Sequence, residues 1–532
     1  MNDLHWWQRG VIYEIIPQSF KDSNGDGMGD LPGLISKLDY LTWLGIDVIW
    51  LGPIYHSPMV DFGYDVSDYE RVNPLFGTLQ DFDRLLAEAH ARNLKVILDF
   101  VANHTSDQHE WFKASRSSRD NPKRDWFLWR DPGPGDGPPN NWMSVFGGSA
   151  WQFDGTTGQY FYHSFTESEV DLNWRNPEVV EAMLDVMRFW LARGVDGFRI
   201  DAAWYLIKDS KWRDNPREPA YEEKTWRIHE RQAPVFSQDQ PECHDILKRM
   251  RRVADEYGDR LLVGEFYLPI DNLLTYYGGR ANDEVHLPNN FQLVILPWEA
   301  DHIAKMVSHY EGKLPAGAWP NYVIGNHDQP RVATRLGLEQ ARIAAMLLLT
   351  LRGTPFLYYG DEIGMMDGPE SEEVYDPQVR DFPYGGGNRT PYRSPMQWDE
   401  SDGAGFSTGT PWLPLTPTHR KWNVERQKRE PDSILMLYRR LLQLRRQEPA
   451  LYGGDYIPLL PQDTVLPFLR EANGTRFLIL LNLGEGTVIY RTSRLNIQGE
   501  VAVCTRVSRE GERVKDFVEL NSHDGLVIRL DP

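Results

Sequence analysis

The stretch "EVVEAMLDVMRFWLARGVDGFRID" (178–201) joins an amphipathic helical pattern, 178–194, to a short and mostly apolar run, 197–201. Near-continuous apolar runs are typical of strands that are buried on both faces of a parallel sheet. A helix that leads into such a strand is the repeating unit of an α/β fold. The number of times this unit recurs therefore decides the architecture of the chain.

The unit recurs along the first 450 residues. Helical patterns at 77–93 and 245–258, with Thr78 as a plausible N-cap of the first, lie between further apolar runs. The predicted strands are 11–17, 47–55, 95–101, 197–201, 261–266, 290–296, 321–328 and 354–362. Eight strands that alternate with helices predict an α/β fold of the (β/α)8 TIM barrel type.

Long insertions interrupt the alternation. Residues 102–175 form a predicted subdomain after the third strand, so the barrel consists of 1–101 and 176–450. The charged stretch 202–245 and the irregular stretch 364–430 also follow strands, and all three insertions should rise from the C-terminal face, where barrel active sites lie. After a helix at 432–447, capped by Ser433, short alternating runs predict a C-terminal antiparallel β-sandwich domain over 451–532.

Composition limits the partners. The net charge of −20 argues against nucleic acid or an anionic membrane as the main partner. Cys243 and Cys504 form no disulfide framework, and neither the opening "MNDLHWWQRG" nor any apolar stretch is a signal peptide or a membrane span. We therefore expect a cytoplasmic protein with a small-molecule substrate, and the sequence leaves its oligomeric state open. The aromatic content of 12% suits sugar faces as well as a core.

Three carboxylates stand at or just after the ends of predicted strands: Asp201, Glu265 and Asp328. A barrel gathers its strand ends on one face, and an acid there is unfavourable unless it is paired or used. A retaining glycosidase needs one carboxylate as nucleophile and another as acid/base, about 5–5.5 Å apart. We expect Arg199 to lower the pKa of Asp201, and the apolar neighbours of Glu265 to raise its pKa.

The loop "KDSNGDGMGD" (21–30) places oxygen ligands at alternate positions. Asp22, Asn24, Asp26 and Asp30 match ligand positions of a calcium loop, but position twelve is Gly33 where an EF-hand has glutamate. The pattern also suits a turn rich in Asp, Asn and Gly. From the residues alone, both interpretations stay open.

Four motifs identify a family resemblance. The segments "DFVANHTSD" (99–107), "GFRIDA" (197–202), "VGEF" (263–266) and "VIGNHD" (323–328) resemble the signature regions of the alpha-amylase superfamily, glycoside hydrolase family thirteen. The opening "WWQRGVIYEIIPQSFKDSNGDGMGDLPGL" (6–34), "RSPMQWD" (393–399) and "GAGFSTG" (403–409) resemble its bacterial alpha-glucosidase and oligo-1,6-glucosidase branch. The resemblance covers nearly the whole chain.

The resemblance implies roles for these residues. Asp201 matches the nucleophile, Glu265 the general acid/base, and Asp328 the carboxylate that binds sugar hydroxyls and stabilises the transition state. Matching substrate-binding residues are Tyr64, His104, Phe146, Phe165, Arg199 and His327. It also implies that Asp22, Asn24, Asp26, Asp30 and the carbonyl of Met28 bind a structural Ca²⁺, with Mg²⁺ as the alternative.

Five further positions bear on how substrate is held. Asp61 and Arg393 match a pair that closes the end of the glucose pocket, and Arg389 is a weaker candidate for the same role. Ala202, next to the nucleophile, is smaller than the valine that accompanies alpha-1,6 preference in this branch, so it predicts acceptance of alpha-1,4 disaccharides. Glu169 stands where close relatives carry glutamine, which puts that contact in doubt.

The sequence thus predicts a retaining, exo-acting alpha-glucosidase that acts on short alpha-glucosides. The first alternative is a transglycosylase or glucoside isomerase, such as a trehalose synthase, on the same scaffold. The second is a non-catalytic protein like the heavy chains of amino-acid transporters. Such heavy chains carry a membrane span and often lose the catalytic carboxylates, whereas this chain keeps all three.

Overall fold

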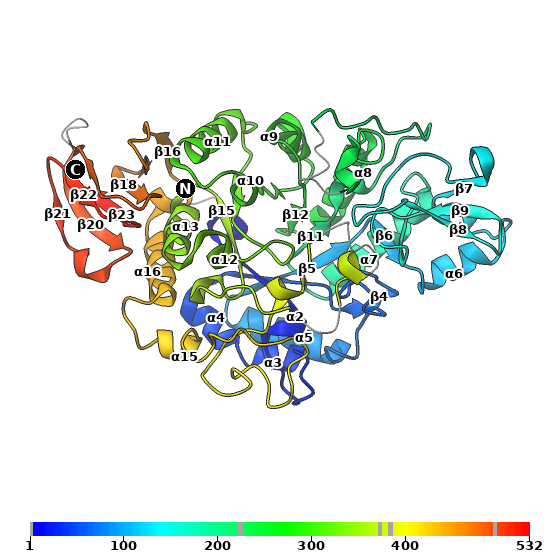
Figure 1. Ribbon diagram of the computed structural model, residues 1–532, viewed down its shortest axis with the longest axis horizontal. Helices are drawn as coiled ribbons and strands as arrows, with labels where there is room; N and C mark the ends of the chain where they lie inside the picture. Colours follow the sequence, from blue (N-terminus) through cyan, green and yellow to red (C-terminus); the bar gives the residue numbers. More distant parts are fainter. Residues whose placement is uncertain (1–3, 221–227, 371–374, 381–386, 493–496) are drawn as a thin grey trace.

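The structure is a computed structural model that describes residues 4–220, 228–370, 375–380, 387–492 and 497–532. It confirms the predicted TIM barrel, because eight parallel strands in these ranges pair in the order β13-β12-β11-β5-β2-β1-β15-β14. They lie at the centre of Figure 1. The strands are β1 (Ile12–Ile15), β2 (Val48–Leu51), β5 (Lys95–Val101), β11 (Gly197–Asp201), β12 (Leu261–Gly264), β13 (Leu287–Pro288), β14 (Asn321–Val323) and β15 (Thr354–Tyr358).

The two ends of the sheet meet at β13 and β14, which form no ladder with each other. Asn321 joins them, because its amide nitrogen donates to Pro288 O (2.6 Å) and its amide oxygen accepts from Asn290 N (3.0 Å). One backbone bond, from Val323 N to Asn290 O (3.2 Å), completes the seam. The barrel is thus closed by a fully buried asparagine side chain.

Helices surround the barrel. Thr78 caps α5 through a reciprocal bond with Asp81, and Ser433 caps α16, as predicted. The longer helices are α5 (Leu79–Ala91), α7 (Pro177–Ala192), α8 (Glu242–Glu256), α11 (Ala300–Lys313), α13 (Leu338–Thr350) and α16 (Ile434–Gln447). Each of these six helices has at least four buried residues facing its neighbours.

The barrel interior is largely apolar, with buried charged residues on β1 (Glu14), β5 (Asp99) and β11 (Arg199). Ile12, Trp50 and Phe356, from β1, β2 and β15, belong to a single buried cluster that fills it. On β11, by contrast, Arg199 and Asp201 alternate with Phe198 and Ile200, which belong to the outer core. Since side chains of a strand alternate between faces, this strand carries charges into the barrel.

One predicted strand is wrong. The run 290–296 is not the sixth strand: β13 lies earlier, at Leu287–Pro288, and Gln292–Ile295 forms the short helix α10. A short apolar run does not by itself distinguish a strand from a helix. The ends of 11–17, 47–55, 321–328 and 354–362 also extend beyond the observed strands, in the first case because Pro17 begins helix α2 (Pro17–Phe20).

The segment between β5 and α7 carries small antiparallel sheets on the right of Figure 1. Strands β7 (Trp129–Arg130), β9 (Gln159–Tyr162) and β8 (Trp151–Asp154) form one sheet beside helix α6 (Glu110–Ser117), and β6 (His104–Ser106) pairs with β10 (Glu169–Asp171). The pairing of β6 with β10 sets His104 opposite Asp171 and fixes the insertion to the C-terminal end of β5.

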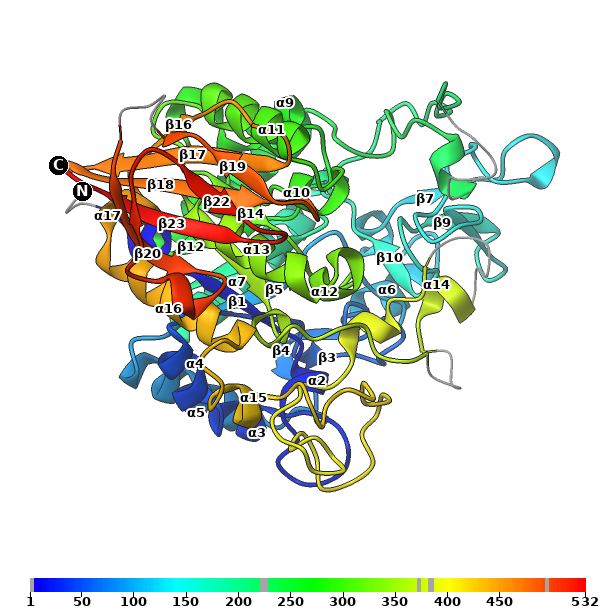
Figure 2. The ribbon, with the colours of Figure 1, turned by 60° about the vertical axis from the view of Figure 1, so that its left-hand side comes forward.

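The C-terminal residues form the predicted antiparallel β domain, seen at the front in Figure 2. Six strands pair in the order β16-β17-β18-β23-β20-β21, and a second sheet pairs β19 with β22. Their bounds are β16 (Asp455–Pro458), β17 (Val465–Ala472), β18 (Thr475–Asn482), β19 (Val488–Tyr490), β20 (Gly499–Cys504), β21 (Arg513–Val514), β22 (Val518–Leu520) and β23 (Gly525–Leu530). Cys243 and Cys504 are buried free thiols. Among the described residues, no helix is long and apolar enough to cross a membrane.

Candidate active site

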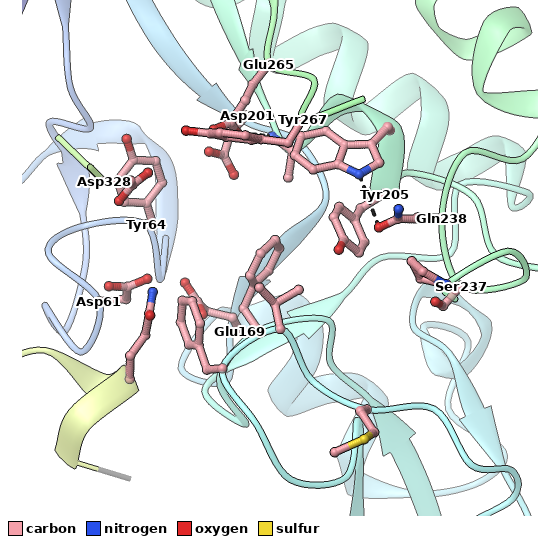
Figure 3. Close-up of a pocket in the computed structure, with 18 of the residues that line it drawn as sticks. Asp61, Tyr64, Glu169, Asp201, Tyr205, Ser237, Gln238, Glu265, Tyr267 and Asp328 are labelled. Atoms are coloured by element: carbon pink, nitrogen blue, oxygen red, sulfur yellow. Dashed lines mark hydrogen bonds between the residues drawn. The ribbon is translucent and has the colours of Figure 1, made fainter. Parts of the chain in front are cut away.

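A pocket of about 700 Å³ opens at the C-terminal ends of the barrel strands. Asp201, Glu265 and Asp328, far apart in sequence, all line it, and Figure 3 shows them facing one space with Tyr64 and Asp61. The other predicted pocket residues that line it are His104, Phe146, Phe165 and Ala202. Arg199, His327 and Arg393 lie behind this surface and contact the lining carboxylates.

Arg199 is the centre of the buried charges. Its Nη1 donates to Asp99 Oδ1 at 2.7 Å and to Asp201 Oδ1 at 2.6 Å, and its Nη2 lies 2.8 Å from Glu265 Oε2. Glu265 Oε2 also accepts from the backbone N–H of Ala202 at 2.9 Å. One guanidinium therefore holds both carboxyl groups that the sequence pairs as nucleophile and acid/base.

This arrangement corrects the expected pKa of Asp201. Burial raises the pKa of Asp201 and that of Glu265, while Arg199 opposes the rise at both. The guanidinium is shared with Asp99, so one cation faces three carboxyl groups, and it does not lower the pKa of Asp201 overall. Such a cluster favours retention of a proton on one member. Arg199 lies at similar distances from Asp201 (2.6 Å) and Glu265 (2.8 Å), so these two carboxyl groups titrate as a coupled pair.

Asp328 has the opposite environment. Arg393 Nη2 donates to its Oδ1 at 2.8 Å, Arg389 Nη1 at 3.3 Å, and His327 Nε2 lies 3.2 Å from Oδ2. Burial alone would raise the pKa of Asp328, but these three neighbours, together with Arg199, outweigh the effect of burial and lower the pKa below its ordinary value. Asp328 is thus the carboxylate of the site that stays ionised most firmly.

Asp61, which was predicted to pair with Arg393 at the end of the pocket, pairs with Arg389 instead. Asp61 accepts from Arg389 Nη2 at 2.5 Å, whereas Arg393 binds Asp328. The second partner of Arg389 is Asp376, which accepts from its Nη2 at 3.0 Å. Arg389 therefore links Asp61 to Asp376. The two arginines are four residues apart, at the N-cap and the last residue of the 3-10 helix Thr390–Arg393, so sequence spacing did not decide between them.

Two buried acids of the site lie inside strands and were missed. Glu14 on β1 is hydrogen bonded to His327 Nδ1, and Asp99 on β5 accepts from the hydroxyl of Tyr64 at 3.0 Å. Tyr64 also bonds His327 Nε2 at 2.9 Å, and the two rings stack. An acid within an otherwise apolar strand, as in "VIYEIIP" and "KVILDFV", is the signal that would have found both.

Glu169 forms a second buried pair at the pocket. Its Oε1 lies 3.5 Å from His104 Nε2, and its Oε2 accepts from the backbone N–H and the hydroxyl of Thr166 at 3.0 and 2.9 Å. Burial alone would lower the pKa of His104, but the charge of Glu169 reverses this and raises the pKa to about 9. The site thus holds His104 as a cation at neutral pH.

The acceptor side is walled by the segment after β11. Ala202 adopts a left-handed conformation (φ +43°), which small residues tolerate and β-branched residues strongly disfavour. Trp204 Nε1 donates to Gln238 at 3.2 Å (dashed in Figure 3), and Tyr205 and Tyr267 line the same region. Part of the predicted 202–245 wall, 221–227, lies outside the described residues.

The loop of residues 21–30 is held by its own hydrogen bonds. Asp22 accepts from the backbone N–H groups of Asn24, Gly25 and Gly27, and Asp30 accepts from Ser23 and from Gly33. Within the described part of the chain, no group of three or more His, Cys, Asp or Glu residues is arranged to hold a metal ion. The oxygen donors of this loop have the chemistry that Ca²⁺ prefers, so the metal site stays a prediction beside the turn.

Comparisons with known proteins find relatives that match this chain over most of its length. Residues 14–454 match the family described as "Alpha amylase, catalytic domain". An oligo-1,6-glucosidase from Heyndrickxia coagulans is 38% identical over 91% of this chain and 93% of its own length. The solved structure of an alpha-glucosyl transfer enzyme is 39% identical with a TM-score of 0.91, over 99% of this chain and 100% of that one. An isomaltulose synthase from Protaminobacter rubrum is 32% identical with a TM-score of 0.88, over the same shares.

Proposed function

This chain belongs to the alpha-amylase family, and we propose that within it the protein is a retaining exo-acting alpha-glucosidase that releases glucose from short alpha-glucosides. The observation that carries the proposal is Arg199, which contacts both Asp201 and Glu265 in one pocket. In this scheme Asp201 attacks the anomeric carbon, and Glu265 gives its proton to the leaving oxygen. Glu265 then removes a proton from water, which releases glucose with retained configuration.

Pocket shape supports exo action. Arg389 lines the pocket and pairs with Asp61 and Asp328, and we infer that this cluster closes one end of the pocket. A chain end fits against such a barrier, whereas the middle of a polysaccharide would have to pass through it. The aromatic rings of Tyr64 and Phe165 add apolar faces beside the charges, which suits the C–H faces of a glucose ring.

Glucosyl transfer or isomerisation is the second candidate. It is favoured by the enclosed acceptor side, where Trp204, Tyr205 and Gln238 form a wall that would hold a second sugar while Asp201 carries the first. Two structural relatives, the glucosyl transfer enzyme and the isomaltulose synthase, bear names of this kind. Hydrolysis and transfer share the covalent intermediate and differ in whether water or sugar reaches it.

One experiment separates the candidates. Purified protein is given maltose, isomaltose, trehalose and sucrose in parallel, and products are followed by proton NMR from the first minutes. We expect alpha-glucose as the main early product, with maltose used at least as well as isomaltose because Ala202 leaves room beside the cleaved bond. Transfer products or isomers without net glucose release would favour the second candidate. Early beta-glucose, or soluble starch cut to mixed oligosaccharides, would contradict the proposal.

A further inference from the structure

A second pocket, of about 490 Å³, lies on the inserted segment away from the catalytic pocket. Residues 127–130, which include strand β7, contribute to its lining together with residues from the segments 173–175 and 210–212. Strand β7 lies on the right of Figure 1. The lining of the pocket contains four arginines, Arg119, Arg124, Arg130 and Arg175, and one acid, Asp125. This basic composition contrasts with the net charge of −20 of the whole chain.

Two of the four arginines have carboxylate partners and two do not. Arg119 pairs with Asp131 at 3.1 Å, and Arg175 with Glu242 at 2.8 Å. For Arg124 and Arg130, no ion pair forms within the described ranges, although Asp125 lines the same pocket. Burial lowers the pKa of both guanidinium groups, to about 10 for Arg124, as expected for cations that lack sufficient counter-charge.

The two cations are held in place by tryptophan rings. The guanidinium of Arg124 lies 3.4 Å from the ring centre of Trp129, and that of Arg130 lies 3.9 Å from that of Trp212. Arg124 Nη1 donates to Ser115 O at 2.9 Å, and its Nη2 donates to Thr157 and Gln159 at 3.0 and 2.6 Å. These neutral acceptors fix the guanidinium but do not neutralise its charge. Because each ring already has an arginine on one face, stacking of a sugar is less suited to this pocket than binding of an anion.

We propose that this pocket, which we call the arginine pocket, binds a phosphate group, supplied either by free phosphate or by a phosphorylated sugar. A phosphate presents several acceptor oxygens and a charge near −2, and planar guanidinium groups bind it through paired hydrogen bonds. Arg130 and Arg124 would both supply charge, and Arg130 would supply the paired hydrogen bonds because both Nη groups of Arg124 already donate within the protein. The site lies outside the catalytic pocket, so the proposal does not depend on which alpha-glucoside is cleaved.

Calorimetric titration in a phosphate-free buffer at low ionic strength tests it, with inorganic phosphate, glucose 6-phosphate and glucose as probes. We expect both phosphate probes to bind. Arg130→Gln and Arg124→Gln should each weaken phosphate binding about tenfold or more, since a charge-assisted contact is lost. Arg188→Gln, which removes a cation from α7 outside the pocket, should leave it unchanged. Maltose turnover without phosphate should stay normal in all three variants and reports intact folding.

Several results would contradict the proposal that the arginine pocket binds phosphate. Absence of phosphate binding would do so, as would equal affinities for the wild type and Arg130→Gln, or equal weakening by Arg188→Gln. The difference between wild type and Arg130→Gln isolates this pocket from sugar bound at the catalytic site. If that difference is larger for glucose 6-phosphate, the ligand is a phosphorylated sugar, and if it is equal for both probes, the ligand is the phosphate group alone.

Discussion

At the scale of single residues, Asp201 and Glu265 should fail in different ways. Asp201→Asn removes the nucleophile, so turnover of every alpha-glucoside should fall by about three orders of magnitude or more. Glu265→Gln removes the proton donor, so the rate of maltose cleavage should fall about 10²–10⁴-fold. The leaving group of a nitrophenyl glucoside needs no proton, so this substrate should form the covalent intermediate at an almost normal rate. Initial bursts of nitrophenol measure that step. Equal losses on both substrates in both variants would contradict the separate roles.

The pair of Glu169 and His104 predicts a pH effect. The folded pKa of His104, about 9, lies above its ordinary value, so the stability it contributes is present below pH about 6.5 and is lost as pH rises through 9. Glu169→Gln removes the charge that raises this pKa. The alkaline limb of kcat/KM should then move to lower pH, and the fall in melting temperature between pH about 6.5 and 9 should become shallower.

Thr166→Val is the matched control for that change. It removes a hydroxyl that donates to Glu169 at 2.9 Å but keeps the carboxylate charge. We expect its pH profile to resemble that of the wild type. If Glu169→Gln leaves the alkaline limb in place, or if Thr166→Val moves it as far, the charge of Glu169 does not govern His104.

Single residues also show what the sequence was able to predict. Asp201, Glu265 and Asp328 were identifiable because each follows a buried run, and the barrel gathers such positions. The charge balance around Asp201 could not be predicted from the sequence, because Asp99 shares the guanidinium of Arg199 only after β5 and β11 have paired. The same limit applies to Arg389, whose contact with Asp61 joins positions more than 300 residues apart.

At the scale of elements, the loop of residues 21–30 is either a metal site or a plain turn, and the two interpretations predict different responses to Ca²⁺. We still predict that chelator lowers the melting temperature and that Ca²⁺ restores it, since a ligand that binds only the folded state stabilises it. Asp22→Ala with Asp26→Ala should abolish the response to Ca²⁺. The response, rather than the starting melting temperature, is the measure, because Asp22 also bonds Gly27 N and Ser407.

Asp402→Ala, at an exposed carboxylate outside this loop, is the control and should keep the full Ca²⁺ response. Indifference of the wild type to chelator and to Ca²⁺, together with a metal analysis that finds none, would leave the loop as a turn stabilised by its own hydrogen bonds.

Helices and strands differed in how well the sequence pattern predicted their positions. Helices α5 and α16 combine apolar spacing with a side-chain cap, and both were located to within about two residues. The sixth strand has only Leu287 and Pro288, and a strand of two residues has no periodicity to detect. Its position is set by pairing with β12, which sequence pattern alone does not contain.

At the scale of the whole molecule, closure of the barrel holds the catalytic groups at fixed separations. Glu265 follows β12, and Asp328 follows β14, so the seam between β13 and β14 lies between the strands that carry them. Elsewhere around the barrel, neighbouring strands are joined by ladders. We therefore expect the position of Asp328 relative to Glu265 to depend on the bonds across this seam, two of which come from the Asn321 side chain.

Asn321→Leu tests this dependence, because leucine has a similar size but forms none of these bonds. Two buried backbone groups, Pro288 O and Asn290 N, would lose their bonds to the side chain, at a cost of about 2–4 kcal/mol in stability. We expect a melting temperature several degrees lower, and a kcat that falls even at temperatures where the variant is fully folded. Tyr322→Phe is the control, since it removes a bond to Glu311 (3.2 Å) from the same strand without touching the seam. If the two variants lose equal stability and keep normal kcat, Asn321 does not hold the active site together, and the outer helices must be what closes the barrel.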